Sequence, residues 1–200
     1  MRVLAQTVSG VLHPLCMPLL TLGLLVLTDG YLVHRLGLFA YLFVLLLINT
    51  LAPAISLWLL KRRGVISDLD IRKRSERPWP FLLVLAYYLM AYVLVVQSTA
   101  VAVPVFYQQV LLSLVVAIAS AWVVTWKAKI SMHMLAQGGI LAVYLHVAMM
   151  DHTWDLNWVS VLLLSAGVVG WSRLRLGAHT PAEVYSGFAL GLLTVWITLF

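Results

Sequence analysis

The sequence has little charge. Only 10% of its 200 residues are charged and 63% are hydrophobic, whereas a soluble domain carries about 25% charged residues. So few charges cannot cover a water-facing surface, and the mean hydropathy of +1.01 points the same way. We therefore expect lipid to be the main solvent of this chain. Its length predicts a single membrane-embedded domain over residues 1–200.

Cysteine and clustered carboxylates are also scarce. The one cysteine, Cys16, lies in an apolar run, so no disulfide can form within the chain. No group of neighbouring carboxylates offers the oxygen ligands that magnesium prefers. Asp151, His152 and Asp155 lie close in sequence, but they do not make a convincing ligand set for another metal. The sequence therefore predicts neither a bound metal nor a cofactor.

Long apolar runs, in contrast, are abundant. A helix that crosses a bilayer needs about 20 apolar residues, and backbone polar groups in lipid must be satisfied within the segment. The sequence predicts an all-α, polytopic transmembrane bundle of six to seven spans. The candidate spans are residues 3–27, 36–60, 80–97, 105–126, 130–150, 156–171 and 184–200.

The first apolar run follows Arg2 and so imitates a signal peptide. Residues 3–27 are longer than the apolar region of such a peptide, which has about 7–15 residues. No small-residue cleavage site follows the run. We expect a retained first span that contains Pro14 and Pro18.

The basic residues fall on one side of the predicted bundle. Seven spans place the N-terminus on the same side as linkers 61–79, 127–131 and 172–182. That side carries twelve basic residues, and the other side carries only Arg35. The positive-inside rule predicts that the basic side is cytoplasmic. We expect the membrane to be a bacterial inner membrane. Lys127 and Lys129 are assigned to this topology signal. The net charge of +6 does not indicate a nucleic-acid partner, because the basic residues lie in short loops between spans.

The basic side also gathers the residue types of phosphoryl chemistry, in segments 70–78, 131–133 and 172–183. Arginine binds phosphate oxygens through two parallel hydrogen bonds, and helix N-termini add oriented N–H groups. One histidine can attack phosphorus, and a second can protonate the departing alkoxide. Because no carboxylate cluster is present to hold magnesium, we expect any hydrolysis here to be metal-independent.

In these segments the chain resembles the type-2 phosphatidic acid phosphatase superfamily. The pattern of that superfamily is K-x6-R-P, then P-S-G-H, then S-R-x5-H-x3-D. The matching residues are Arg77, Pro78, Ser131, His133, Ser172, Arg173, His179 and, in the place of the final acid, Glu183. The matches keep the order of the family, and the third part has its full spacing.

Some positions depart from the pattern. Asp70 stands where the family has lysine, and Ile130 and Met132 replace proline and glycine. Lys73 or Arg74, one helical turn further along, is expected to supply the missing cation. The sequence leaves open which of the two does so.

The resemblance implies a role for each matched residue. His179 would attack phosphorus and form a phosphohistidine, and Glu183 would bond its other ring nitrogen, as a carboxylate does in catalytic triads. His133 would protonate the leaving lipid alcohol and then activate water. The phosphate oxygens would be bound by Arg77, Arg173, Ser131 and either Lys73 or Arg74.

Glu183 also has a purely structural interpretation. Residues 180–183 read as a capping box with Pro181 at the first helical position, so the carboxylate can serve to begin the last helix. We expect both roles to hold together. His13 and His146 lie inside predicted spans and are interpreted as neutral histidines bonded to neighbouring helices.

The expected activity is hydrolysis of a phosphomonoester or pyrophosphate of a lipid, with the bilayer as the other partner. A cytoplasmic site favours phosphatidic acid or phosphatidylglycerophosphate, and an outward site favours undecaprenyl pyrophosphate. Two alternatives stay open. One is a lipid phosphotransferase that uses the same histidine. The other is a catalytically decayed protein that binds anionic lipids, for which Asp70 is the main argument.

Overall fold

The structure is a computed structural model that describes residues 1–29 and 31–200. Over these residues it contains helices and no strand. The elements are α1 (Arg2–Val11), η1 (Pro14–Cys16), α2 (Met17–Thr28), α3 (Gly30–Val33), α4 (Leu36–Arg62), η2 (Arg74–Glu76), α5 (Pro78–Val96), α6 (Val105–Thr125), α7 (Met132–Met150), α8 (Leu156–Arg175) and α9 (Pro181–Leu199). The predicted all-α polytopic bundle is confirmed.

Six helical segments of the described chain are long and apolar enough to cross a membrane: Arg2–Thr28, Leu36–Arg62, Pro78–Val96, Val105–Thr125, Met132–Met150 and Pro181–Leu199. The seventh predicted span corresponds to α8, which has 20 residues but is more polar and ends with Arg173 and Arg175 in its last turn. These segments are compatible with an integral, multi-pass membrane protein.

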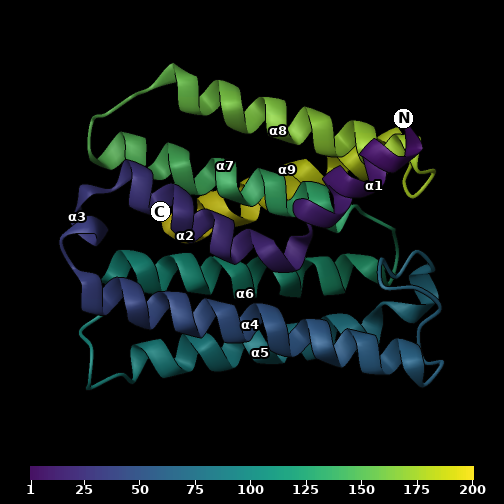
Figure 1. Cartoon of the computed structure of the whole chain (residues 1–200), viewed down its shortest axis with the longest axis horizontal. Coiled ribbons are helices and arrows are strands. Elements are labelled where there is room, and N and C mark those ends of the chain that lie inside the picture. The colour runs from purple at the N-terminus through teal and green to yellow at the C-terminus, as the bar shows by residue number, and fades with distance from the viewer.

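The long helices lie side by side along a common axis (Figure 1). The N-terminus and the α4–α5, α6–α7 and α8–α9 linkers gather at one end of the bundle. The α2–α4, α5–α6 and α7–α8 linkers and the C-terminus lie at the other end (Figure 1). The linkers therefore alternate between the two ends as the seven predicted segments require. Segments 70–78, 131–133 and 172–183, which match the phosphatase pattern, all lie at the first end.

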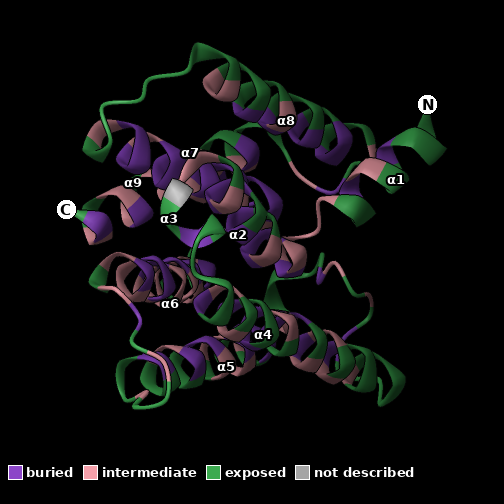
Figure 2. Cartoon of the chain, turned by 60° about the vertical axis from the view of Figure 1, so that its left-hand side comes forward, coloured by how far each residue is buried: buried purple, intermediate pink, exposed green. Residues whose placement is uncertain are grey.

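Helix α7 is the central helix. It packs against α2, α6, α8 and α9, and 72% of its most apolar stretch is buried, against at most 39% for the other candidate spans. Figure 2 shows buried residues concentrated on α7, whereas the outer faces of α4 and α8 are exposed. Exposed residues on α8 include Leu163 and Leu164. A large apolar surface of this kind suits lipid contact.

The first predicted span is interrupted near its middle. Helix α1 ends at Val11, a short 3-10 turn begins at Pro14, and α2 begins three residues later. Proline ends a helix because it lacks the backbone N–H and its ring crowds the preceding turn. The backbone N–H of Leu15 lies 3.3 Å from Nδ1 of His13, which caps the turn. Since α1 packs on α8 and α2 packs on α4 and α7, the break places His13 at the junction of these helices.

Glycines set the close approach of α7 and α9. A Cβ atom added to Gly138, Gly187 or Gly191 would clash with backbone atoms of the facing helix. Small residues spaced four apart allow membrane helices to pack backbone to backbone. The contact brings the two N-termini together, and the backbone N–H of Ser131 donates to the carbonyl of Glu183 at 3.0 Å. The second and third motif segments therefore meet because these helices carry glycine at their interface.

Candidate functional site

The best-defined polar pair in the site is His179 with Glu183. His179 lies in the α8–α9 linker, and its Nδ1 is 2.7 Å from Oε2 of Glu183 in the first turn of α9. The capping box is present as well, because Thr180 Oγ1 accepts from the N–H of Glu183 while Glu183 Oε2 accepts from the N–H of Thr180. One carboxylate thus begins the helix and orients the imidazole.

The imidazole of His179 is neutral at ordinary pH. Burial lowers its pKa to about 4, against the opposing effect of the bond to Glu183, and the charges of Arg173, Lys129 and Arg77 lower the pKa further. A neutral ring that donates its Nδ1 proton to a carboxylate keeps the lone pair on Nε2. That nitrogen is therefore available as a nucleophile.

Arg77 is held between two linkers at this end of the bundle. Its side chain is only 1% exposed, its Nε donates to the carbonyl of Ile71 at 2.9 Å, and its Nη1 donates to the carbonyl of Ile130 at 2.8 Å. Burial lowers the pKa of Arg77 to about 10, so the group stays protonated at neutral pH. The positive charge of Arg77 is therefore fixed at the backbone of Ile130, the residue before Ser131.

Arg173, at the end of α8, is also 1% exposed. Its Nη1 donates to the hydroxyl of Ser9, and its Nη2 lies 3.2 Å from Oδ2 of Asp70. Asp70 stands where the resemblance leads one to expect lysine, so a predicted phosphate ligand is paired with the residue that departs most from the pattern. Arg72 lies 3.6 Å from the same carboxylate oxygen.

Several matched residues leave buried polar atoms without a partner. In the described part of the chain, Ser131 Oγ, Ser172 Oγ and Arg173 Nε are three of only six such side-chain atoms. An unsatisfied buried polar group costs about 1–3 kcal/mol. Half of the unpartnered atoms therefore belong to residues that match the pattern.

The two cations expected to replace the family lysine make other contacts. Nζ of Lys73 lies 3.2 Å from Oε1 of Glu76, and its side chain is 66% exposed. Arg74 donates from Nη1 to the backbone carbonyl of Lys127. The structure therefore shows neither cation bonded to another matched residue in the described part of the chain.

Lys129, in contrast, lies beside the His179–Glu183 pair. Its Nζ is 3.6 Å from Oε2 of Glu183 and donates to the carbonyl of Ala178 at 2.8 Å. From its place in a short basic linker, this lysine is expected to be only a topology signal. Its position two residues before Ser131 was the available sign of a role in the site.

His133 has a separate environment. Its Nε2 lies 3.0 Å from the carbonyl oxygen and 3.1 Å from the hydroxyl of Ser9. No hydrogen bond among the described residues joins His133 to His179. Arg173 links the two neighbourhoods, because it donates to Ser9 and its charge acts on His179.

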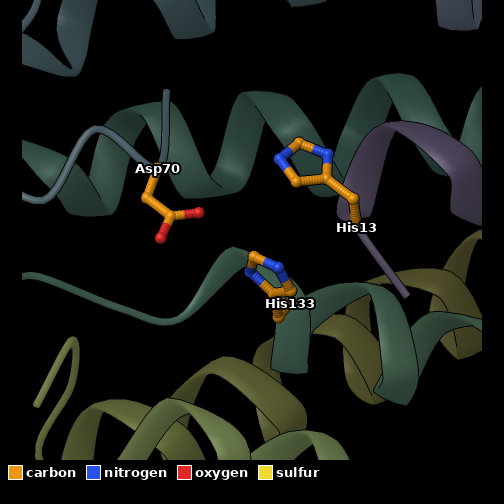
Figure 3. Close-up of side chains that lie close together, drawn as sticks. All are labelled: His13, Asp70 and His133. Carbon is orange, nitrogen blue, oxygen red and sulfur yellow. The ribbon is translucent and has the colours of Figure 1, made fainter. Parts of the chain in front are cut away.

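His133 belongs to a second cluster, with His13 and Asp70, that was not predicted from the sequence. One potential metal-ligating atom each from His13, Asp70 and His133 lies within 4.8 Å of the others, and the three side chains face a common space (Figure 3). The rings of His13 and His133 are edge to face, with centroids 5.3 Å apart. The prolines after His13 were the available signal, because they break the first span at this residue.

The same three residues line a cavity of about 140 Å³ that is otherwise bounded mainly by apolar side chains of α2, α4, α5, α6 and α7. Among the described residues that line it, they are the only histidines and the only carboxylate. The cavity therefore has one strongly polar wall.

No family model, curated protein or solved structure matches this chain. The fold and site define a polytopic helical membrane protein with two buried arginines, a His179–Glu183 pair and a cluster of His13, Asp70 and His133 at one end of the bundle.

Proposed function

We propose that the protein is a membrane phosphatase that hydrolyses a phosphomonoester or pyrophosphate of a lipid through a phosphohistidine at His179. The observation that carries this proposal is the 2.7 Å contact between Nδ1 of His179 and Glu183. That contact orients a buried, neutral imidazole close to the charges of Arg77 and Arg173. A nucleophile, an orienting carboxylate and fixed cations are the elements that covalent phosphoryl transfer requires.

In the first step, Nε2 of His179 attacks phosphorus and the bond from phosphorus to the lipid oxygen breaks. The imidazole becomes positively charged when the P–N bond forms, and Glu183 stabilises that charge through Nδ1–H. His133 is the proposed donor of the proton that the lipid alcohol takes up. In the second step, His133 takes a proton from water, the water oxygen attacks phosphorus and the P–N bond breaks, so inorganic phosphate leaves and both histidines are restored.

The surrounding donors suit the phosphoryl group. Ser131 Oγ, Ser172 Oγ and Arg173 Nε are buried and lack partners, so phosphate oxygens would satisfy them without breaking existing hydrogen bonds. Lys129, already 3.6 Å from Glu183, adds a cation that the motif does not contain. The superfamily pattern has a lysine at the position of Asp70. We propose that Lys129, in place of Lys73 or Arg74, supplies the positive charge of that lysine.

We propose a bacterial inner membrane as the location, with the site at the cytoplasmic face. Twelve basic residues lie in the segments at the site end and one lies at the other, and the positive-inside rule assigns the basic end to the cytoplasm. A substrate of the phosphatidic acid or phosphatidylglycerophosphate type follows from that side.

The ion pair between Asp70 and Arg173 favours a second candidate, a decayed phosphatase that binds anionic lipids. A carboxylate 3.2 Å from Arg173 competes with phosphate for that guanidinium. In this candidate the protein binds lipid phosphates but does not hydrolyse them.

Phosphate release tests the proposal. The purified protein would be given a panel of lipid phosphates in detergent with EDTA present, beside His179→Ala and the control His34→Ala, which alters an exposed histidine in the α2–α4 linker. We expect release by the wild type and the control, and none by His179→Ala. Binding without release by a folded, monodisperse wild type would favour the decayed candidate, and a newly phosphorylated second lipid would identify phosphotransfer.

A further inference from the structure

We propose that His13, Asp70 and His133 form a binding site for a divalent transition metal of the zinc class, with its fourth coordination position open to the apolar cavity. The site is distinct from the His179–Glu183 pair. Its existence does not depend on the proposed phosphatase function.

The first argument is the spacing of the three side chains. Their potential ligand atoms lie within 4.8 Å of one another. Nitrogen and oxygen ligands of tetrahedral zinc, at about 2.0–2.2 Å from the ion, are about 3.3 Å apart. To bind one ion, the three atoms would therefore have to approach one another by rotation of the side chains. Figure 3 shows the carboxylate and both rings already facing the same space.

The second argument is the donor set. Two imidazoles and one carboxylate form the three-ligand set of zinc sites that keep one exchangeable position. Magnesium and calcium prefer sites built from oxygen alone. Because all three residues line the cavity, the remaining position would be reached from that side, by water or by a phosphate oxygen.

The third argument is that neighbouring groups orient the ligands. A carbonyl oxygen only accepts, so Nε2 of His133 carries the proton that bonds to the carbonyl of Ser9 at 3.0 Å. Its Nδ1 then keeps the lone pair, an arrangement typical of metal-binding histidines. Oδ2 of Asp70 faces Arg173, which leaves Oδ1 as the oxygen for the metal.

His13 requires one adjustment. Its Nδ1 currently accepts from the N–H of Leu15 over 3.3 Å, which is long for a hydrogen bond. Moving the ring proton to Nδ1 gives up that weak bond and frees Nε2 for a metal. The nearby charges of Arg173 and Arg72 oppose a divalent cation, so we expect an anionic fourth ligand such as hydroxide or phosphate.

A metal here would join three distant parts of the chain: the break between α1 and α2, the α4–α5 linker and the start of α7. It would also withdraw His133 from proton transfer. If the phosphatase proposal holds, zinc therefore lowers the rate of phosphate release and EDTA restores it. That consequence rests on the proposed function, whereas metal binding itself does not.

Direct metal binding tests the site. The tag-free full chain in detergent, stripped with EDTA and then dialysed free of it, would be titrated with Zn²⁺ by calorimetry. Bound Co²⁺ would be followed in parallel by its visible absorption. We expect one equivalent with a tetrahedral Co²⁺ spectrum, and at least a tenfold weaker affinity in His13→Gln and in Asp70→Asn. The control His34→Ala should bind as the wild type does.

The absence of stoichiometric binding to the wild type would overturn the proposal. So would affinities unchanged in both His13→Gln and Asp70→Asn. Thermal unfolding offers a second measurement that is valid even if one variant folds poorly, because a ligand of the native state raises Tm. Zinc should raise the Tm of the wild type and of His179→Ala, and a wild-type Tm unmoved by zinc would contradict the site. Phosphate release in EDTA reports on the phosphatase proposal alone.

Discussion

Asp70 and Arg173, which are 103 residues apart in the chain, form an ion pair with 3.2 Å between Oδ2 and Nη2. The pair ties the α4–α5 linker to the end of α8. It gives the buried guanidinium of Arg173 a counter-charge and places a carboxylate where the resemblance leads one to expect lysine. The charge distribution of the site therefore differs from the one that the resemblance predicts.

Removing the charge of Asp70 tests this relationship. Asp70→Asn leaves the buried guanidinium of Arg173 without its counter-ion, and we expect a loss of about 1–3 kcal/mol of stability. Arg72→Gln is the matched control, because the Arg72 side chain is 47% exposed and a surface ion pair contributes about 0–1 kcal/mol. Thermal or denaturant unfolding in detergent measures both. Equal losses in the two variants would contradict a special role for the Asp70–Arg173 pair.

The carboxylate of Glu183 can be separated from its capping role. Glu183→Gln keeps a side chain able to accept from the N–H of Thr180 but removes the charge that is proposed to stabilise His179 during attack. We expect phosphate release to fall at least about 100-fold with little change in stability. Thr180→Ala makes the opposite change: it removes the cap, at about 1 kcal/mol, and should largely preserve activity. Similar activity losses in both variants would indicate that Glu183 acts only through the helix.

The pH dependence of the rate follows from His179. Its pKa is lowered to about 4, so the nucleophilic neutral ring persists well below the ordinary histidine value of about 6.5. Because this pKa belongs to the substrate-free protein, we expect the acid limb of kcat/KM, attributable to this residue, near pH 4. An acid limb near pH 6.5 that moves in Glu183→Gln would show that His179 is not buried as described.

The same shift affects stability, with a defined sign. Between pH 6.5 and about 4 the unfolded chain takes up a proton at His179 that the folded chain excludes. This residue therefore makes stability fall as the pH decreases through that interval. His179→Ala should flatten that part of the stability profile.

The close contact between α7 and α9 holds Ser131 and Glu183 together in the site. Gly191→Ala would push a methyl group into the backbone of Leu135, and we expect a loss of about 1–3 kcal/mol or more, with reduced activity because Ser131 and Glu183 separate. Gly167→Ala on α8 meets nothing within 4 Å and should be neutral or stabilising by up to about 1 kcal/mol. Indistinguishable unfolding and activity of the two variants would argue against this packing.

Much of the fold could be predicted from the sequence, because apolar length determines which segments cross a membrane. The break in the first span was harder to predict. Pro14 and Pro18 were visible, but residues 3–27 read as continuous by apolar content alone. Pro14 ends α1, but the packing of α1 on α8 and of α2 on α4 and α7 depends on tertiary structure and could not be predicted.

Some contacts of the site could likewise be predicted from the sequence, whereas others depend on tertiary packing. The His179–Glu183 contact was predicted from the resemblance, and it joins residues only four apart in the chain. The contacts of Asp70 with Arg173 and of His133 with Ser9 join distant segments, and their geometry comes from helix packing. Lys129 was assigned to topology because a basic residue in a short linker serves that purpose equally well.

The most direct test of the central claim is to trap the phosphoryl group on the protein. The wild type would be mixed briefly with a lipid phosphate in EDTA, quenched at alkaline pH where phosphohistidine survives, and mapped by mass spectrometry. We predict that phosphate is found on His179 of the wild type and is absent from His179→Ala. Phosphate release by the wild type with no label on His179, matched by release from His179→Ala, would contradict the account.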